Sequence, residues 1–304
     1  MTLRSSSNLR VTGLITALAL LWGSGFFWIK LGLDGFTPTQ LTLARLALGA
    51  LVLVPIVLVR RLRLPRGSAM WGHLAVSALI ANAIPYTLFA VAEQTTPSSI
   101  AGVINATTPL WTAIIALLMC VDRPVKRRRL SGLALGFVGA VVVLSPWSTD
   151  SPGTLGGFIA CAAAAASYGG AYVYQARYLT NRGLSPLVLT ASQLAIATGM
   201  LAITLPFGPG TETHPGVIAI AAVVILGVLG TGLALVINYR LITTEGPTSA
   251  SVVTYLLPAV AVALGVAILG EPAGWSLPIG GALILLGVAL VRRSRPAEPA
   301  RRPP

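Results

Sequence analysis

The chain has 304 residues, of which 55% are hydrophobic and only 10% are charged, whereas an ordinary soluble domain carries about 25% charged residues. A soluble fold of this size needs a charged surface that this composition cannot supply, but a bilayer accepts an apolar exterior. The formal net charge of +13 comes from short basic clusters between long apolar stretches, not from a basic face with interleaved aromatic residues, which argues against a nucleic-acid-binding protein.

Ten apolar segments, each close to the roughly 20 residues that a helix needs to cross a bilayer, follow one another along the chain. They lie at about 11–31, 38–59, 70–92, 97–120, 130–147, 154–178, 185–206, 215–241, 247–270 and 275–291. The connections are too short to hold a soluble domain. We therefore expect an all-α membrane protein with ten transmembrane helices, preceded by a cytoplasmic N-terminus at 1–10 and followed by a disordered cytoplasmic tail at 292–304.

The basic residues predict the orientation of these helices. When the N-terminus is placed in the cytoplasm, 19 of the 21 Lys and Arg residues fall on the cytoplasmic side, and the other two, Lys30 and Arg45, lie within helices. Cytoplasmic loops carry an excess of Lys and Arg in most membrane proteins. We therefore expect a multi-pass protein of the inner (plasma) membrane with both termini in the cytoplasm.

The two halves of the sequence are similar to each other at offsets of 146, 148 and 149 residues. The corresponding positions are 22–26 (WGSGF) and 168–172 (YGGAY), Arg45 and Gln193, and Pro109 and Pro258. Each half thus holds five helices, at 11–147 and 154–291. Because five is odd, the second half should enter the membrane from the opposite side. Inverted five-helix repeats are typical of transporters, although a duplication without transport is the alternative.

These features resemble the drug/metabolite transporter superfamily and, within it, the EamA-type transporters. The resemblance is carried by ten helices in two halves, a Trp-Gly-Ser at Trp22, Arg45 in the second helix, Pro109 in the fourth, and acidic residues after the fourth and ninth helices. Two positions depart from the pattern: Asp122 stands where the family usually has Glu, and Gln193 stands where the first half has an arginine. The resemblance implies a secondary transporter, and it alone implies export.

Polar and aromatic side chains at mid-membrane depth are candidates for a substrate pathway, because polar groups in hydrocarbon are costly and mark functional sites. The residues predicted to line this pathway are Trp22, Ser24, Arg45, Asn82, Tyr86, Asn105, Thr108, Tyr168, Tyr172, Gln175, Gln193 and Tyr255. For each of them, packing or hydrogen bonding between helices is the alternative role. Pro109 and Pro258 are expected to act as hinges, since proline removes a backbone hydrogen bond from a helix.

Arg45 has two competing interpretations. It lies about two turns into its helix, where it could attract a carboxylate or phosphate group of the substrate. Alternatively, it could extend toward the outer surface and pair with Asp34 or Glu93. Glu271, at the end of the ninth helix, is expected to pair with basic loops, and the GxxxG motif at 132–136 predicts a helix-packing face.

The sequence contains no Gly-Lys-Ser/Thr phosphate-binding loop, which excludes ATP hydrolysis by that route. It also shows no catalytic cluster, metal-ligand set or cofactor motif, so we expect no enzyme.

We predict a secondary transporter that moves a small metabolite, amino acid or drug-like compound by alternating access. The alternative is a non-transporting polytopic membrane protein, either an intramembrane enzyme or a scaffold. The expected partners are a small-molecule solute and the lipid bilayer but no nucleic acid. The sequence shows no carboxylate in the middle of a helix, which leaves the coupling ion open, and it leaves the oligomeric state open as well.

Overall fold

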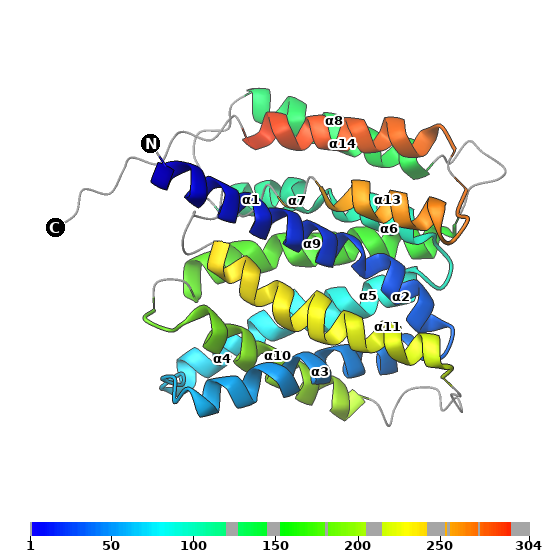
Figure 1. Cartoon of the computed structure of the whole chain (residues 1–304). Coiled ribbons are helices and arrows are strands. Elements are labelled where there is room, and N and C mark those ends of the chain that lie inside the picture. The colour runs from blue at the N-terminus through cyan, green and yellow to red at the C-terminus, as the bar shows by residue number, and fades with distance from the viewer. Residues whose placement is uncertain are drawn as a thin grey trace.

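A computed structural model describes residues 2–119, 127–144, 153–179, 182–204, 215–241, 253, 256–272 and 274–292. Every regular element in these ranges is helical, and most of the helices run roughly along one common direction (Figure 1). The predictions that concern Asp122, Tyr255 and the tail after Arg292 lie outside the described residues.

Ten membrane-spanning segments can be followed in order along the chain. They are α1 (Thr2–Gly23) with α2 (Gly25–Leu33), α3 (Pro38–Val59), α4 (Ser68–Ala78) with the π-helix η1 (Leu79–Ala83) and α5 (Ile84–Ala92), α6 (Ser98–Asn105) with α7 (Thr108–Leu118), α8 (Arg127–Leu144), α9 (Leu155–Tyr178), α10 (Pro186–Thr204), α11 (Val217–Gly227) with the π-helix η3 (Val228–Leu233) and a helical stretch at 234–241, α13 (Leu257–Ala267), and α14 (Ser276–Arg292). Seven of these segments are long and apolar enough to cross a membrane, and α8, α13 and α14 contain shorter apolar stretches. The predicted all-α membrane fold is confirmed.

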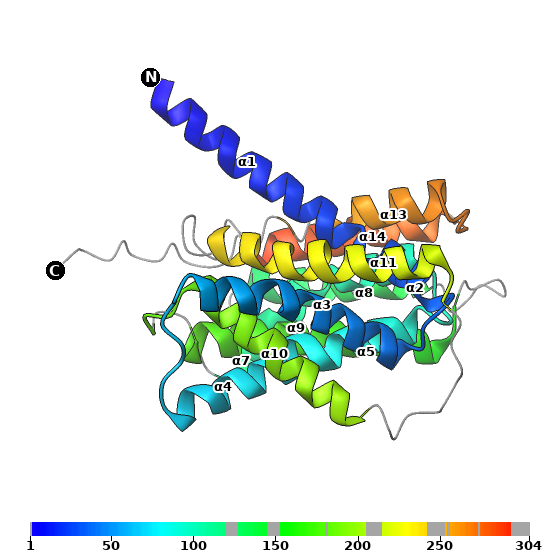
Figure 2. The same ribbon diagram turned by 60° about the horizontal axis from the view of Figure 1, so that its bottom comes forward.

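The two halves enter the bundle from opposite ends. α1 begins at one end, here called the proximal end, and α5 finishes at the other, here called the distal end (Figure 1). The hydroxyl of Thr154, which precedes α9, lies 2.7 Å from the hydroxyl of Thr95, which follows α5, so the second half starts at the distal end. α14 returns to the proximal end, where the first turns of α1 project beyond the other helices (Figure 2). The second repeat therefore runs inverted relative to the first, as the odd number of helices requires.

Glycines set the closest approach between helices at one edge of the bundle, where α8 and α14 lie side by side (Figure 1). A Cβ atom added at Gly139 would lie 2.7 Å from the carbonyl oxygen of Gly280, and one added at Gly287 would lie 2.5 Å from the carbonyl oxygen of Gly132. Small residues of this kind allow membrane helices to approach backbone to backbone. The GxxxG motif is therefore a helix-packing face, as predicted.

Breaks interrupt the helices at corresponding places in the two halves. η1 and η3 begin at Leu79 and Val228, and α7 and α13 begin at Thr108 and Leu257, so both pairs are 149 residues apart. π-Helical segments inside α-helices are rare and occur mostly at functional sites. The repeat is thus visible in the backbone as well as in the sequence.

The fourth span is interrupted near Pro109, because Ala106 and Thr107 form a turn between α6 and α7. Pro109, the second residue of α7, cannot donate a hydrogen bond to the preceding turn. The hydroxyl of Thr107 donates to the carbonyl of Ile104 at 2.7 Å. Pro258 is likewise the second residue of α13. Both prolines start a helical segment, where the missing N–H costs little, and their role as hinges stays a prediction.

Candidate functional site

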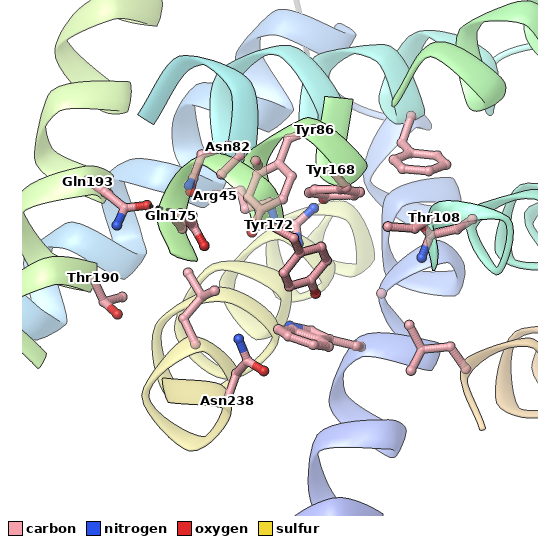
Figure 3. A pocket seen from close by; sticks show the side chains of 18 of the residues that line it. Arg45, Asn82, Tyr86, Thr108, Tyr168, Tyr172, Gln175, Thr190, Gln193 and Asn238 are labelled. Atoms are coloured by element: carbon pink, nitrogen blue, oxygen red, sulfur yellow. Dashed lines mark hydrogen bonds between the residues drawn. The ribbon is translucent and has the colours of Figure 1, made fainter. Parts of the chain in front are cut away.

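A cavity lies between the two halves of the chain, with side chains from both halves in its walls (Figure 3). Its volume is about 120 Å³, counted as the space open to the centres of water-sized spheres. One buried water needs about 10–15 Å³ on this measure, so the cavity has room for a solute about the size of an amino acid. The lining residues are Trp22, Gly25, Phe26, Ile29, Arg45, Ala81, Asn82, Tyr86, Phe89, Asn105, Thr108, Tyr168, Ala171, Tyr172, Gln175, Thr190, Gln193, Leu235, Asn238, Tyr239 and Leu257.

Most of the lining positions are related by the internal repeat. The corresponding pairs are Trp22 and Tyr168, Gly25 and Ala171, Phe26 and Tyr172, and Ile29 and Gln175 at an offset of 146; Arg45 and Gln193 at 148; and Tyr86 and Leu235, Phe89 and Asn238, and Thr108 and Leu257 at 149. In an inverted repeat, corresponding positions lie at opposite depths on either side of a shared axis. The cavity therefore occupies the place where the two halves meet symmetrically.

The chemistry of the corresponding positions is not symmetric. Toward the distal end the walls carry Ile29 and Phe89, whereas their counterparts toward the proximal end are Gln175 and Asn238. A solute inside would meet an apolar surface at one end and side-chain amides at the other. Such a gradient suits a molecule with one apolar and one polar part.

Arg45 reaches from the first half to a residue of the second. It is 7% exposed, and its Nε donates to the hydroxyl of Thr231 in η3 at 2.7 Å. Its guanidinium carbon lies 3.7 Å from the centre of the Tyr86 ring, within the range of a cation–π interaction. In the described part of the chain, Arg45 makes its hydrogen bond through Nε alone. The other N–H groups of its guanidinium fork can therefore bind an anion in the cavity.

The two carboxylates considered as partners of Arg45 do not bind it. Asp34 is exposed on the surface of the bundle. Both side-chain oxygens of Glu93 are buried without a hydrogen-bond partner among the described residues. The geometry thus favours the interpretation in which Arg45 faces a solute, and its role in binding stays a prediction.

Gln193, the counterpart of Arg45, joins several helices at the proximal side of the cavity. Its Oε1 accepts hydrogen bonds from the hydroxyl of Ser77 at 3.1 Å and from Nε2 of Gln175 at 3.4 Å, and its Nε2 donates to the hydroxyl of Tyr239 at 3.0 Å. Nε2 of Gln175 also donates to the hydroxyl of Ser77 at 3.0 Å. These bonds hold the amides in place as neutral polar groups.

Aromatic rings form one wall of the cavity. The rings of Tyr86 and Tyr168 meet edge to face at 6.3 Å, and those of Phe89 and Tyr168 stack at 6.0 Å. Phe26 adds an edge-to-face contact with Phe89 at 5.3 Å. In Figure 3, Tyr86, Tyr168 and Tyr172 lie around the same space. These rings offer a flat apolar surface with hydroxyl groups at its margin.

Ten of the twelve predicted pathway residues line this cavity. Ser24 does not, because it lies two residues, or about 200° around the helix, from Trp22, and its hydroxyl donates to the carbonyl of Leu21 at 3.4 Å. Tyr255 lies outside the described residues. That the ten take part in transport stays a prediction.

The sequence analysis passed over several lining residues, among them Phe26 and Thr190. Phe26 could have been found from helical spacing, since it lies one turn after Trp22 on the same face. The hydroxyl of Thr190 is buried and, among the described residues, has no hydrogen-bond partner, so it can bond to a solute. Nothing in the local sequence of Thr190 indicates this position.

A carboxylate of the second half binds the start of α6 at the distal end of the bundle. Oε1 of Glu271 accepts hydrogen bonds from the backbone N–H of Ser98 at 2.7 Å and from its hydroxyl at 2.8 Å, and Oε2 accepts from the backbone N–H of Ser99 at 2.9 Å. We call this contact the distal latch. The expectation that Glu271 pairs with basic loops is wrong, because the unsatisfied N–H groups and positive dipole at the start of α6 bind it instead.

Comparison with known proteins gives a consistent result over the whole chain. Residues 11–145 and 155–293 each match the model of the EamA-like transporter family. The chain is 27% identical to the uncharacterized inner membrane transporter YedA of Escherichia coli (strain K12), over 98% of this chain and 96% of that protein. It is 26% identical to a probable terminal-alkyne amino-acid exporter of Streptantibioticus cattleyicolor, over 92% of this chain and 95% of that protein. One solved crystal structure has the same fold, with a TM-score of 0.67 at 22% identity, over 93% of this chain and 98% of the other.

Proposed function

Because the chain belongs to the EamA-like transporter family and is a membrane transporter, we propose that it exports a small zwitterionic or anionic metabolite with an apolar body, about the size of an amino acid. The observation that supports this substrate class is the cavity, in which a guanidinium lies over aromatic walls and faces a region of neutral amides.

The cavity has a group for each part of such a solute. The fork of Arg45 matches the two oxygens of a carboxylate. The rings of Tyr168 and Phe89 would cover an apolar or aromatic body. Amide groups such as those of Gln175 and Asn238 would bond to an ammonium or hydroxyl group. The relative described as a probable amino-acid exporter supports the same class, and both the direction and the class remain proposals for this chain.

Alternating access would follow from the inverted repeat. Two similar halves packed around one cavity can each adopt the conformation of the other. When the two halves swap conformations, the cavity opens at the opposite end. In the present arrangement the distal latch ties the start of α6 to the residues after α13. Opening toward the distal end would therefore require the latch to break.

Flux measurements in inside-out membrane vesicles test this proposal. Vesicles from cells that produce the protein would be supplied with labelled phenylalanine, tyrosine and leucine, with phenethylamine as an analogue that lacks the carboxylate, and with glucose as a neutral polar control. We expect accumulation of one or more of the amino acids above that in vesicles from cells without the protein. Transport of phenethylamine or glucose alone, or the absence of flux for every amino acid in the panel, would contradict the substrate class.

A further inference from the structure

Glu93 is a carboxyl group that the transport scheme above does not use. It follows α5 directly at the distal end, one residue beyond the apolar span Ser68–Ala92. Its side chain is 0% exposed, and neither side-chain oxygen has a hydrogen-bond partner among the described residues. An ionised carboxylate in that situation carries a large desolvation penalty, whereas the neutral acid does not.

Titratable groups face Glu93 from each of the helices around it. Lys30 on α2 donates from Nζ to the backbone carbonyl of Glu93 at 2.7 Å, and Arg45 approaches from α3. Glu271, the carboxylate of the distal latch, and Cys161 on α9 complete the set in the described part of the chain. Burial raises the pKa of Glu93 well above its usual range. Lys30 and Arg45 lower this pKa, and Glu271 raises it.

We propose that Glu93 is the proton-binding site of this transporter, neutral while the distal end is closed and ionised when that end opens to water. The position of Glu93 makes the link to opening direct, because the distal latch at Ser98 and Ser99 lies only a few residues along the chain. When the latch breaks and water enters, the carboxyl group transfers its proton to water, and the resulting carboxylate is hydrated. Reclosure requires a proton from the distal solution to return to the carboxylate.

The coupling has a definite sign. A group that keeps its proton in the closed form and loses it in the open form favours opening as the pH rises and closure as the pH falls. Between the two pKa values the ratio of open to closed molecules should change about tenfold for each pH unit, since one proton is released. An acidic distal solution would thus favour the closed form and a more alkaline one would favour distal opening, so Glu93 makes distal opening sensitive to the pH of the distal solution.

Infrared spectroscopy of the purified full-length protein tests the protonation without any solute. We expect a carboxylic-acid C=O stretch at neutral pH that is absent in Glu93→Gln. The matched control Asp34→Asn, which removes an exposed carboxyl group near the same end, should leave this band unchanged. A wild-type spectrum without the band, or a band that survives in Glu93→Gln, would overturn the proposal.

Thiol labelling tests the link to opening. In a Cys120→Ser background, Cys161 is the one remaining thiol; it is 0% exposed and lies near Glu93. A membrane-impermeant thiol reagent applied from the distal side should label Cys161 faster in this parent than in Glu93→Gln. The ratio of the two labelling rates at equal pH should rise about tenfold for each pH unit. Comparing the proteins at equal pH cancels the effect of the thiol's own titration on the labelling rate. Glu93→Asp keeps a titratable carboxyl group and should restore the pH dependence of the rate ratio. Equal rates in Glu93→Gln and the parent at every pH would refute the link.

The inference rests on the proposed transport function only for the effect of distal pH on solute flux. Both measurements above are made on substrate-free protein, so they can succeed even when no amino acid in the vesicle panel is transported. Once a panel amino acid is transported, changing the pH of the distal solution alone should change its flux in the parent protein and in Asp34→Asn but have no effect in Glu93→Gln. A full pH effect in Glu93→Gln would place the titrating group elsewhere.

Discussion

Arg45→Gln separates recognition of an anionic group from packing, because glutamine is a buried polar residue at the corresponding position of the second half, Gln193. If the guanidinium binds the carboxylate of the solute, the substitution removes a charge-assisted hydrogen bond worth about 1.5–3 kcal/mol. About 1.4 kcal/mol corresponds to a tenfold change in affinity. The apparent affinity for a carboxylate-bearing solute should therefore fall by roughly tenfold to a hundredfold.

The substitution also removes two contacts within the protein. The hydrogen bond from Nε to Thr231 is worth about 1 kcal/mol, and the stacking on Tyr86 is worth about 0.5–2 kcal/mol. Some loss of stability is therefore expected, and flux has to be normalised to the amount of protein in the membrane. Thr231→Val is the matched control, since it removes the acceptor of Nε but keeps the guanidinium, and it should change the affinity only a few-fold.

The decisive assay compares a solute with its analogue that lacks the carboxylate. Uptake of phenylalanine and of phenethylamine into inside-out vesicles would be measured as a function of concentration for the parent protein, Arg45→Gln and Arg45→Lys. We expect a large loss of affinity for phenylalanine in Arg45→Gln, a smaller loss in Arg45→Lys because lysine lacks the planar fork, and little change for phenethylamine. Equal losses for both solutes, or no loss for phenylalanine, would refute the role of Arg45 in binding the carboxylate.

Three further predictions concern the latch, the helix packing and the topology. Glu271→Gln replaces one accepting oxygen of the distal latch by an N–H group and removes a charge at a helix start, so it should destabilise the latched form by about 1–3 kcal/mol. The expected result is faster labelling of Cys161 from the distal side, and an unchanged labelling rate would contradict the role of the latch. Gly139→Val should lower the thermal unfolding temperature, because its side chain would collide with the backbone of Gly280, whereas Gly199→Ala, which meets nothing within 4 Å, should not. Alkaline phosphatase fused after Arg295 should be inactive in cells, because both termini are expected in the cytoplasm, and an active fusion would reverse the predicted orientation.

The sequence alone predicted the spans, the repeat and much of the cavity, because these follow from local properties. Apolar length indicates the helices, and depth along each helix indicates which polar residues meet. The orientation expected from the basic residues stays a prediction. Trp22 and Tyr168 could be placed together because each lies near the middle of the first helix of its half. Ser24 was misplaced because depth alone does not say which face of a helix points inward.

The sequence alone could not predict contacts between segments that lie far apart in the chain. Glu93 is followed by Gln94-Thr95-Thr96-Pro97, a polar stretch typical of an exposed loop, yet it is fully buried because neighbouring helices cover it. Glu271 was assigned to basic loops because the sequence does not show that the start of α6 lies beside it. Both residues depend on contacts between segments far apart in the chain, including Lys30 with Glu93 and Ser98 with Glu271.

The two ends of the cavity differ in how their closure can respond to the surroundings. A transporter built from two identical halves would have inward- and outward-facing forms of equal free energy, and only differences between corresponding residues can make them unequal. In this chain the network around Gln193, on the proximal side of the cavity, consists of neutral groups whose hydrogen bonds do not change between acidic and neutral solution. The distal side holds the Glu271 latch and, under our proposal, the proton of Glu93. A change in the pH of the distal solution should therefore act on distal opening through Glu93.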